Sequence, residues 1–532
     1  MAISIATFKL SISSRPFFPF LLKSSQSFNL PTFFRSWAST ASVEALDEAE
    51  FLIKPIKSRS PGAEKVQAWK KLSSKELGVS TSSISGPTKV VLKELKKRGY
   101  EVYLVGGCVR DLILKRVPKD FDILTSAELR EVLRSFRHAE IVGKRFPICL
   151  VHIGDHVVEV SSFNTGQRRS NKKSPFQFEV PTGCDEKDNI RWRNCMQRDF
   201  TINGLMFDPF ARIVYDYTGA LEDLKKAKVR TIIPASISFH EDCARILRAV
   251  RVAARLGFRL ERETAQCVRN SSYSILRLDK GRFLLEMNYM LAYGSAEASL
   301  RLLWRFGLLE IILPHQAAYL VRCGFRRKDS GSNMLLALFS NLDKLLAPDM
   351  PCHSSLWVTL LAFHKALSDQ ARAPSVIAAF ALAVNNGGDI EEAIDITSTI
   401  SRPSEPNFHE LLEHQKSEKT ALKEEVQSLA ISVNVALSSM TDEYAVSKAM
   451  AKYPQAPQSD LVLIPLGLYM RVCRIFECVT KGREVGFLSK QGGKIDYDML
   501  AIGRLQEVRH VFARVVFDTI YPLSLSDHHI AL

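Results

Sequence analysis

The sequence predicts an α+β protein in which strands and helices are unevenly distributed along the chain. From about residue 86 to residue 235, short apolar runs alternate with helical periodicities, a pattern typical of a region that contains a sheet. Beyond residue 236 the strand signals almost vanish. Helical periodicities then continue, interrupted by segments rich in proline, glycine or asparagine. We therefore expect a sheet-containing head followed by helical domains.

Composition and charge narrow the classes of function. The chain has 532 residues, 46% of them hydrophobic, which is enough for about three or more domains with real cores. It carries 72 basic and 57 acidic residues, a net charge of +15, which favours an anionic partner such as nucleic acid. Its longest apolar runs are far too short to span a membrane, so we expect no membrane association. Its ten cysteines show no CxxC pair and no zinc-ligand spacing, which is typical of free thiols in a reducing compartment.

The N-terminal segment differs in composition from the rest of the chain. Residues 1–43 are rich in serine and phenylalanine, and carry four basic residues but no acidic residue before Glu44. This composition predicts an organellar transit peptide, for the mitochondrion or the chloroplast. The segment lacks the clean apolar stretch of a secretory signal. Residues 44–85 are polar and serine-rich toward their end, and predict a linker.

The most informative run of the sequence combines two glycines with two acidic residues. The apolar segment Val102–Val105 predicts a strand that ends in Gly106 and Gly107, where the backbone can turn and approach a ligand closely. A helical segment follows, and a second strand is predicted to carry Asp120 and Asp122. Because side chains alternate along a strand, we expect both carboxylates to face the same way, roughly 6.6 Å apart. This arrangement predicts a site for Mg²⁺ and a nucleotide.

Two segments carry a family resemblance. They read Leu-Val-Gly-Gly-Cys-Val-Arg-Asp at 104–111 and Asp-Phe-Asp-Ile at 120–123, and together they resemble the signature of the DNA polymerase β nucleotidyltransferase superfamily. They are most similar to its class II branch, the bacterial-type poly(A) polymerases and CCA-adding tRNA nucleotidyltransferases. The resemblance implies a small mixed-sheet nucleotidyltransferase (polymerase β-like) head, followed by an all-α neck, body and tail. It also implies that Gly106, Gly107 and Arg110 hold a triphosphate.

Two later segments extend the resemblance. The family's third carboxylate falls at Glu159, in Val-Val-Glu-Val-Ser-Ser-Phe-Asn, where Asn164 replaces the family's arginine. The family segment that holds the triphosphate and sugar reads Gln-Arg-Asp-Phe-Thr-Ile-Asn-Gly here, with glutamine in place of one arginine. The nucleotide-binding candidates that it retains are Arg198, Asp199 and Asn203. A guanidinium suits this role because it donates paired hydrogen bonds to phosphate oxygens.

A helix is predicted over residues 239–258. At about 100° per residue, its small and aliphatic side chains form one face and its arginines gather on the other side. On an isolated helix such arginines would simply be solvated, with an acidic residue near the N-terminus favoured by the helix dipole. The resemblance assigns Asp242 and Arg245 to the pair that reads the Watson–Crick edge of the incoming base. We include Arg248 and Arg251 among the candidates for nucleotide binding.

Two features bear on the choice between poly(A) and CCA addition. Residues 141–151 resemble a signature of the bacterial poly(A) polymerases, and they also predict a turn at Gly143 that leads into a buried strand. A basic stretch over residues 168–173 predicts a loop, which either covers nucleotide or RNA or is a disordered surface loop. The segment over residues 141–151 favours poly(A) addition, whereas the basic stretch does not distinguish between the two reactions.

The resemblance implies a template-independent RNA nucleotidyltransferase, in which the 3′ end of an mRNA, rRNA or tRNA attacks the α-phosphate of ATP. Asp120 and Asp122 would bind two Mg²⁺ ions, with Glu159 completing the catalytic set. ATP is the substrate, and the oligomeric state stays open. Two alternatives also stay open. One is a CCA-adding tRNA nucleotidyltransferase, and the other is a catalytically weak RNA-binding protein on the same fold, to which the two replaced arginines point.

These observations divide the chain into five parts. They are the transit peptide (1–43), the linker (44–85), the nucleotidyltransferase head (86–235), the helical neck with its base-recognition helix (236–329) and an RNA-binding helical body and tail (330–532). RNA is recognised largely through shape and phosphate contacts, so little sequence signature is expected in the last part.

Overall fold

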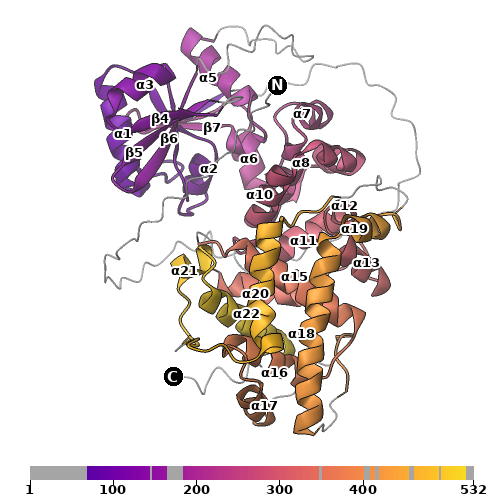
Figure 1. Cartoon of the computed structure of the whole chain (residues 1–532). Coiled ribbons are helices and arrows are strands. Elements are labelled where there is room, and N and C mark those ends of the chain that lie inside the picture. The colour runs from indigo at the N-terminus through magenta and orange to yellow at the C-terminus, as the bar shows by residue number, and fades with distance from the viewer. Residues whose placement is uncertain are drawn as a thin grey trace, which may run out of the picture. The chain divides into compact units, whose positions relative to one another are not determined.

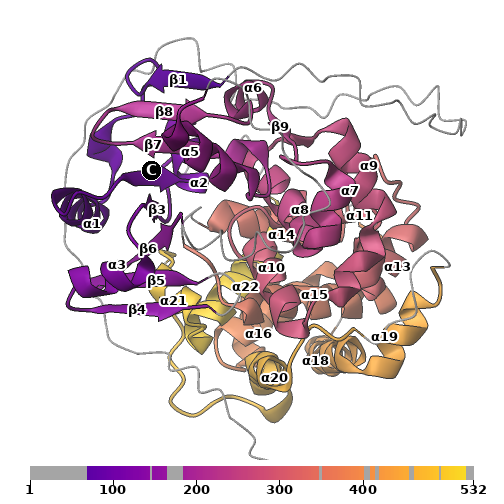
Figure 2. The ribbon, with the colours of Figure 1, turned by 90° about the horizontal axis from the view of Figure 1, so that it is seen from above.

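The computed structural model describes the greater part of the chain after residue 68 (Figures 1 and 2). The described residues are 69–143, 147–163, 184–346, 350–400, 408–413, 418–453, 461–490 and 493–522. The predicted transit peptide, the basic stretch over residues 168–173 and Asn164 lie outside them.

The head is built on an eight-stranded sheet, ordered β1-β8-β7-β2-β3-β6-β5-β4. The pair β3 and β6 is parallel and the other neighbours are antiparallel, so the sheet is mixed, as predicted. In sheet order the strands are β1 Lys70–Ser73, β8 Ile213–Asp216, β7 Leu205–Asp208, β2 Val102–Val105, β3 Asp122–Thr125, β6 His156–Ser162, β5 Ile148–Ile153 and β4 Ala139–Val142.

Helices pack on both faces of this sheet. Along β2, Val102 and Leu104 enter one core and Tyr103 and Val105 enter the other, so the strand is buried on both sides and its sequence is continuously apolar. The first core also takes in helices α1 and α3, and the second takes in α5. The helices of the head are η2 Thr81–Ser83, α1 Gly86–Lys97, α2 Gly107–Ile113, α3 Leu129–Ser135, α5 Glu186–Met196, η3 Thr201–Asn203 and α6 Ala220–Lys225.

The end of the predicted linker belongs to the head. Strand β1 pairs with β8 along the edge of the sheet. Its sequence, Lys-Lys-Leu-Ser, shows no apolar alternation because backbone pairing rather than side-chain burial holds it in place. The serines beyond it act as helix caps: Ser80 accepts from the N–H of Ser82, and Ser85 accepts from the N–H of Thr88. The prediction of a linker over residues 44–85 is therefore wrong for its C-terminal part.

Beyond the head, the described chain is almost entirely helical, as predicted. The neck contains α7 Ala235–Glu241, α8 Ala244–Leu256, α9 Arg262–Asn270, η4 Ser272–Arg277, α10 Lys280–Leu291, α11 Ala296–Arg305, α12 Leu309–Ile312 and α13 Pro314–Arg322. Its short strand β10 Arg259–Leu260 pairs in parallel with β9 Lys228–Val229 at the end of the head. The body and tail contain α14 Met334–Leu345, α15 Ser354–Asp369, α16 Pro374–Asn385, α17 Ile390–Ser398, α18 Lys419–Thr441, α19 Glu443–Met450, α20 Leu466–Lys481, α21 Tyr497–Ala501 and α22 Leu505–Ile520.

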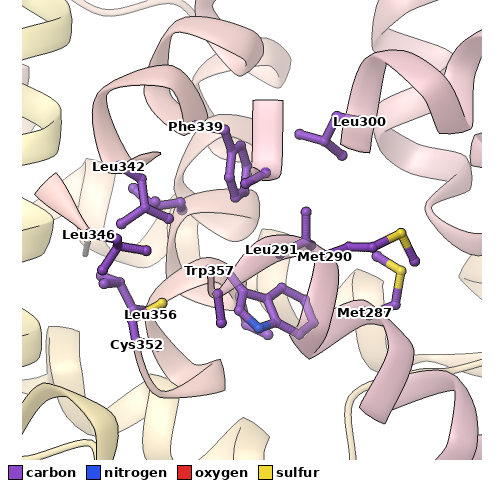
Figure 3. Close-up of a cluster of buried hydrophobic side chains, with 14 of the residues drawn as sticks. Met287, Met290, Leu291, Leu300, Phe339, Leu342, Leu346, Cys352, Leu356 and Trp357 are labelled. Atoms are coloured by element: carbon purple, nitrogen blue, oxygen red, sulfur yellow. The ribbon is translucent and has the colours of Figure 1, made fainter. Parts of the chain in front are cut away.

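Neck and body share one hydrophobic core. Figure 3 shows Met287 and Met290 of α10 facing Phe339 of α14 and Trp357 of α15. The indole N–H of Trp357 donates to Asn288 Oδ1 at 2.9 Å, so the polar atom of this buried ring is satisfied. None of the described helices combines the length and the apolar character that a membrane span requires. The ten cysteines are all free, as their spacing predicts.

Candidate active site

The glycine turn after β2 brings two guanidinium groups together. Gly106 has φ +79° and ψ −141°, a conformation that glycine adopts without strain, and α2 begins at Gly107. A Cβ atom on Gly106 would lie 2.8 Å from Nη1 of Arg198, and one on Gly107 would lie 3.3 Å from Nη2 of Arg110. Both glycines therefore give room for an arginine side chain at the turn, which is the chemistry that a triphosphate requires.

One of the predicted carboxylates lies next to this turn, and a second lies beside it on the neighbouring strand. Asp122 is the first residue of β3, and its Oδ2 would lie 3.3 Å from a Cβ on Gly106. The parallel register that pairs Ile123 with Val160 places Glu159 of β6 beside Asp122. Since Ile123 and Val160 both point into the first core, Asp122 and Glu159 point to the other face of the sheet.

Asp120 does not lie in a strand, contrary to the prediction. Strand β3 begins at Asp122, opposite Val105, and the chain before it has no partner because β2 ends there and turns at Gly106. Asp120 is exposed and belongs to the loop that connects α2 with β3. The two aspartates therefore do not share the regular strand geometry expected of an alternating pair.

The three carboxylates nevertheless influence one another electrostatically. Burial and the negative charge of Asp120 raise the pKa of Asp122, although Arg198 and Arg248 partly oppose the shift. Glu159 is exposed, yet the protein around it restricts its hydration; this effect and the charges of Asp122 and Asp120 raise its pKa. Asp122 and Glu159, whose pKa values are raised by burial and by neighbouring negative charge, gain from a bound cation.

This donor set fits Mg²⁺ that arrives with a nucleotide. Among the described residues, no group of three or more His, Cys, Asp or Glu side chains is arranged to hold a metal ion by itself. Mg²⁺ is commonly bound by one or two carboxylates together with substrate phosphates, so a complete protein cage is not required. Asp120 and Asp122 could supply those carboxylates, and Glu159 could supply a third oxygen donor.

Two buried hydrogen bonds and one ion pair connect the glycine turn with the neck. Arg110 Nη1 donates to Asn203 Oδ1 at 2.7 Å, and Asn203 Nδ2 donates to Asp199 Oδ1 at 3.0 Å. Oδ2 of Asp199 then lies 2.8 Å from Nη2 of Arg248 in α8. Burial raises the pKa of Asp199, but Arg248 and Asn203 outweigh it, so the pKa is lowered and the carboxylate is ionised. Asp199 and Asn203 thus hold two arginines in place.

Arg198 points from the same segment toward the carboxylates. Its guanidinium lies against Gly106 and helps to oppose the rise in the pKa of Asp122. Its Nε is buried and has no hydrogen-bond partner among the described residues. A buried guanidinium N–H without an acceptor is costly, and an anionic ligand at the turn would relieve that cost. Among the predicted nucleotide-binding residues, Arg198 has the clearest structural reason for that role.

The predicted helix over residues 239–258 is broken at Asp242, contrary to the expectation. Helix α7 ends at Glu241 and α8 begins at Ala244. Asp242 has extended backbone angles, φ −145° and ψ 99°, and its Oδ1 accepts from the N–H of Ala244 at 3.2 Å. Aspartate favours such local side-chain bonds over helix continuation. The apolar face of α8 is confirmed, since Ile246, Ala249, Val250 and Ala253 are all buried.

In this structure the side chains of the expected base-reading pair bond to other groups rather than to each other. Asp242 Oδ2 lies 3.2 Å from Nη2 of Arg282 in α10. Arg245 donates to Ser238 Oγ at 2.9 Å and to the carbonyl oxygen of Gln197 at 3.4 Å. The pair therefore lies where α7, α8 and α10 meet the head segment that carries Arg198.

Two residues at this place had no sequence signal. Arg282 contacts Asp242, and Glu286, one turn further along α10, accepts from Arg251 Nε at 3.0 Å. Both act across a helix–helix contact that periodicity cannot show. Asp279, which caps α10 by accepting from the N–H of Arg282, marks the start of that helix but not the role of either side chain.

Comparison with known proteins identifies the family. Residues 102–230 match the sequence family described as "Poly A polymerase head domain", and residues 257–320 match "Probable RNA and SrmB- binding site of polymerase A". Poly(A) polymerase I of Salmonella typhi is 31% identical over 318 residues, which cover 58% of this chain and 67% of the relative. The chain belongs to the poly(A) polymerase and CCA-adding enzyme family. The CCA-adding enzyme of Geobacillus thermodenitrificans is 33% identical over 219 residues, 41% of this chain and 52% of that relative.

A solved family member overlaps more loosely. The Bacillus stearothermophilus CCA-adding enzyme in complex with CTP is 22% identical, with a TM-score of 0.41 over 75% of this chain and 94% of the other. Within the poly(A) polymerase and CCA-adding family, the head match contains the glycine turn, the carboxylates and Arg198, whereas Asp242 and Arg245 fall between the two matched segments. Helices α14 to α22 lie outside both matched segments.

Proposed function

We propose that this protein is a template-independent RNA nucleotidyltransferase that adds AMP from ATP to RNA 3′ ends, a poly(A) polymerase. The observation that carries the proposal is the position of Asp122 beside a glycine turn lined by Arg110 and Arg198, with Asp120 and Glu159 near enough for the charges of the three carboxylates to be felt among them. Clustered carboxylates beside guanidinium groups suit the transfer of a nucleotidyl group from a Mg²⁺-bound triphosphate. Several relatives in the same family are poly(A) polymerases I.

Each part of the site has a role in the proposed reaction. Asp120 and Asp122, helped by Glu159, would hold two Mg²⁺ ions, which when bound stabilise the attacking and leaving oxygens. Arg198 and the backbone of the glycine turn would bind the triphosphate and keep it in line with the RNA 3′-hydroxyl. The hydroxyl attacks the α-phosphate of ATP, and pyrophosphate leaves.

The neck supplies base selection in this proposal. The carboxylate of Asp242 would accept a hydrogen bond from the exocyclic amine of adenine, and Arg245 would donate to a ring nitrogen. The buried chain from Arg110 to Arg248 would hold the triphosphate side and the base side in a fixed relation. Arg251, which is held by Glu286, would line the same side of α8.

Primer extension tests the proposal. Purified protein would be incubated with Mg²⁺ and each nucleoside triphosphate separately, on an unstructured RNA and on a tRNA that lacks its 3′ end. We expect long tails from ATP alone on the unstructured RNA. Asp120→Ala should abolish transfer and leave the thermal unfolding profile unchanged, whereas Asp155→Ala, an exposed residue in the β5–β6 turn, should transfer like wild type. Transfer near the wild-type rate by Asp120→Ala would contradict the assignment of Asp120 as a catalytic residue.

CCA addition is the second candidate, favoured by the similarity to CCA-adding enzymes. It predicts addition of two cytidines and one adenosine on the truncated tRNA and no extension of the unstructured RNA. RNA binding without extension of either substrate would instead favour a binding protein that keeps the fold.

We also propose that the protein acts in an organelle, a mitochondrion or a chloroplast. The basis is the composition of residues 1–43, which are basic, rich in serine and free of acidic residues. A fluorescent protein fused after residue 68 should be imported with that segment and stay in the cytosol without it. Cytosolic fluorescence in both cases would contradict the proposal.

A further inference from the structure

The loop that carries Asp120 is attached to the neck through the residue next to it. Lys119 Nζ donates to the hydroxyl oxygen of Tyr293, just beyond α10, at 3.1 Å. The same ammonium group lies 4.6 Å from the centre of the Tyr293 ring. One side chain thus provides both a hydrogen bond and a cation–π contact to the residue that precedes a predicted metal ligand.

From Tyr293 the contacts continue to the helix that faces the head. The rings of Tyr293 and Tyr289 are 5.6 Å apart, and the guanidinium carbon of Arg251 lies 5.0 Å from the Tyr289 ring centre. Arg251 is in turn fixed by Glu286 at 3.0 Å. Helices α8 and α10 are neighbours (Figure 2), so this series of side-chain contacts crosses the interface between them.

The same loop has a second anchor on α8. Arg116 Nη1 donates to the carbonyl oxygen of Arg255, near the C-terminal end of α8, at 3.2 Å. Lys115, earlier in the loop, bonds to the carbonyl oxygen of Gly78 in the head. Asp120 itself is exposed and lies outside regular structure, so its position depends on how the loop around it is held.

We propose that Tyr293 is a positioning residue for Asp120: it holds Lys119 and thereby fixes the loop at the place where the carboxylate can share a metal ion with Asp122. The inference rests on the proposed function. The Lys119 contact is exposed, so it contributes little to global stability. Its effect falls on the local position of the loop, which is what a metal ligand outside a strand requires.

The test compares four single variants of the full chain. Tyr293→Leu removes both contacts, Tyr293→Phe keeps only the ring, and Lys119→Met removes the charge. Lys96→Met is the matched control, because Lys96 also lies over an exposed ring, that of Phe210 at 5.8 Å, elsewhere in the head.

Two readouts are measured for each variant. The first is hydrogen–deuterium exchange of residues 114–121 without metal or nucleotide. We expect faster exchange in Tyr293→Leu and Lys119→Met, a smaller increase in Tyr293→Phe, and none in Lys96→Met. The second is the Mg²⁺ concentration that gives half-maximal AMP transfer. It should rise roughly 10-fold in Tyr293→Leu, as for other residues that orient a metal ligand, while kcat at saturating Mg²⁺ and KM for ATP stay near wild type.

Three outcomes in the single variants would overturn the positioning role. They are unchanged exchange in Tyr293→Leu, faster exchange with an unchanged Mg²⁺ requirement, and equal effects in Lys96→Met. The double variant Lys119→Met/Tyr293→Leu should behave like either single variant, because both substitutions remove the same interaction, that between Lys119 and Tyr293. Additive losses would also contradict the proposal. Absence of transfer by the wild-type protein would overturn the proposed function instead, and the exchange comparison would then decide alone whether Tyr293 holds the loop.

Discussion

Gly106 shows how a single hydrogen atom in place of a side chain can shape a site. Its φ of +79° is expensive for any residue with a Cβ atom. The Cβ would also press on the guanidinium of Arg198 at 2.8 Å and approach the Asp122 carboxylate at 3.3 Å. Backbone conformation and site geometry therefore depend on the same atom.

Gly106→Ala and Gly99→Ala separate these two effects. Gly99 also has a positive φ, +88°, but a Cβ there meets nothing within 4 Å. Each variant should lose roughly 1–2 kcal/mol of stability from backbone strain. Only Gly106→Ala should also lose nucleotide transfer, since it displaces Arg198. The measurements are chemical denaturation and primer extension, and similar activity in the two variants would contradict the site geometry.

The raised pKa values of Asp122 and Glu159 predict a specific pH dependence. As the pH falls, these carboxylates take up protons earlier than ordinary ones, so transfer should be lost on the acid side at a higher pH than usual for carboxylates. Metal ions compete with protons for the same oxygens, so more Mg²⁺ should move this loss to lower pH. A pH–rate profile at two Mg²⁺ concentrations checks this prediction. If the pH at which transfer is lost on the acid side does not change with Mg²⁺ concentration, metal binding by these residues is contradicted.

Among the elements, helix α11 is capped from outside its own segment. Both oxygens of Asp343 in α14 accept from its first turn, Oδ1 from the N–H of Ala296 at 2.9 Å and Oδ2 from that of Glu297 at 3.0 Å. Burial nevertheless raises the pKa of Asp343 to about 6, although these bonds oppose the shift. This helix end therefore responds to pH.

The sign of that response follows from the shift. Folded Asp343 keeps its proton to a higher pH than the unfolded chain, so the free energy of unfolding should fall as pH rises from 3.8 to about 6 and then level off. Asp343→Asn keeps an acceptor without the charge and should remove this fall. Asp343→Ala removes both acceptors and should lower stability by roughly 1 kcal/mol. Urea denaturation across this window measures both, and an unchanged slope in Asp343→Asn would refute the assignment.

Elements were predictable where a local pattern dictates them. Val102–Val105 has the predicted bounds because burial on both faces leaves an uninterrupted apolar run between a polar loop and two glycines. Strand β1 was missed because its pairing uses the backbone alone. The break at Asp242 was missed because a period of 3.6 residues describes spacing and not side-chain capping.

The same distinction applies to the site. The glycines and carboxylates were recognisable because their chemistry depends on residues close together in sequence. The contact between Asp199 and Arg248 was not, since it depends on how the neck packs against the head. Arg282 and Tyr293 were missed for the same reason: their partners lie in distant segments of the chain.

At the scale of the whole molecule, one hydrophobic core runs through the head, the neck and the body. It includes Leu104 of the sheet, Val250 of α8, Met287 of α10 and Phe512 of α22. Polar contacts follow the same route, since the buried carboxylate of Asp199 in the head depends on a guanidinium from the neck. The stability of the head therefore depends on its contacts with the neck.

Arg248→Met tests this dependence. It leaves Asp199 as a buried charge without its partner, so we expect a loss of roughly 3 kcal/mol of stability. Asp199→Asn in the same chain should recover part of that loss. Arg255→Met, on the same helix and half-buried, is the control and should change stability little. Denaturant titration of the four proteins measures this, and equal stability of Arg248→Met and Arg255→Met would contradict the dependence.

Strand β1 also limits how far the chain can be shortened from its N-terminal side. A protease that removes residues before Trp69 leaves all eight described strands of the sheet in the chain. A cut within Lys70–Ser73 uncovers the backbone of β8, and a bare edge of this kind recruits other strands. It also removes the ion pair between Lys71 and Asp188, in which Nζ and Oδ2 are 2.6 Å apart. Strand β1 would thus set a physical limit to proteolytic shortening of the chain. Cleavage beyond this limit should first produce aggregates, while the carboxylates of the candidate active site still hold their positions.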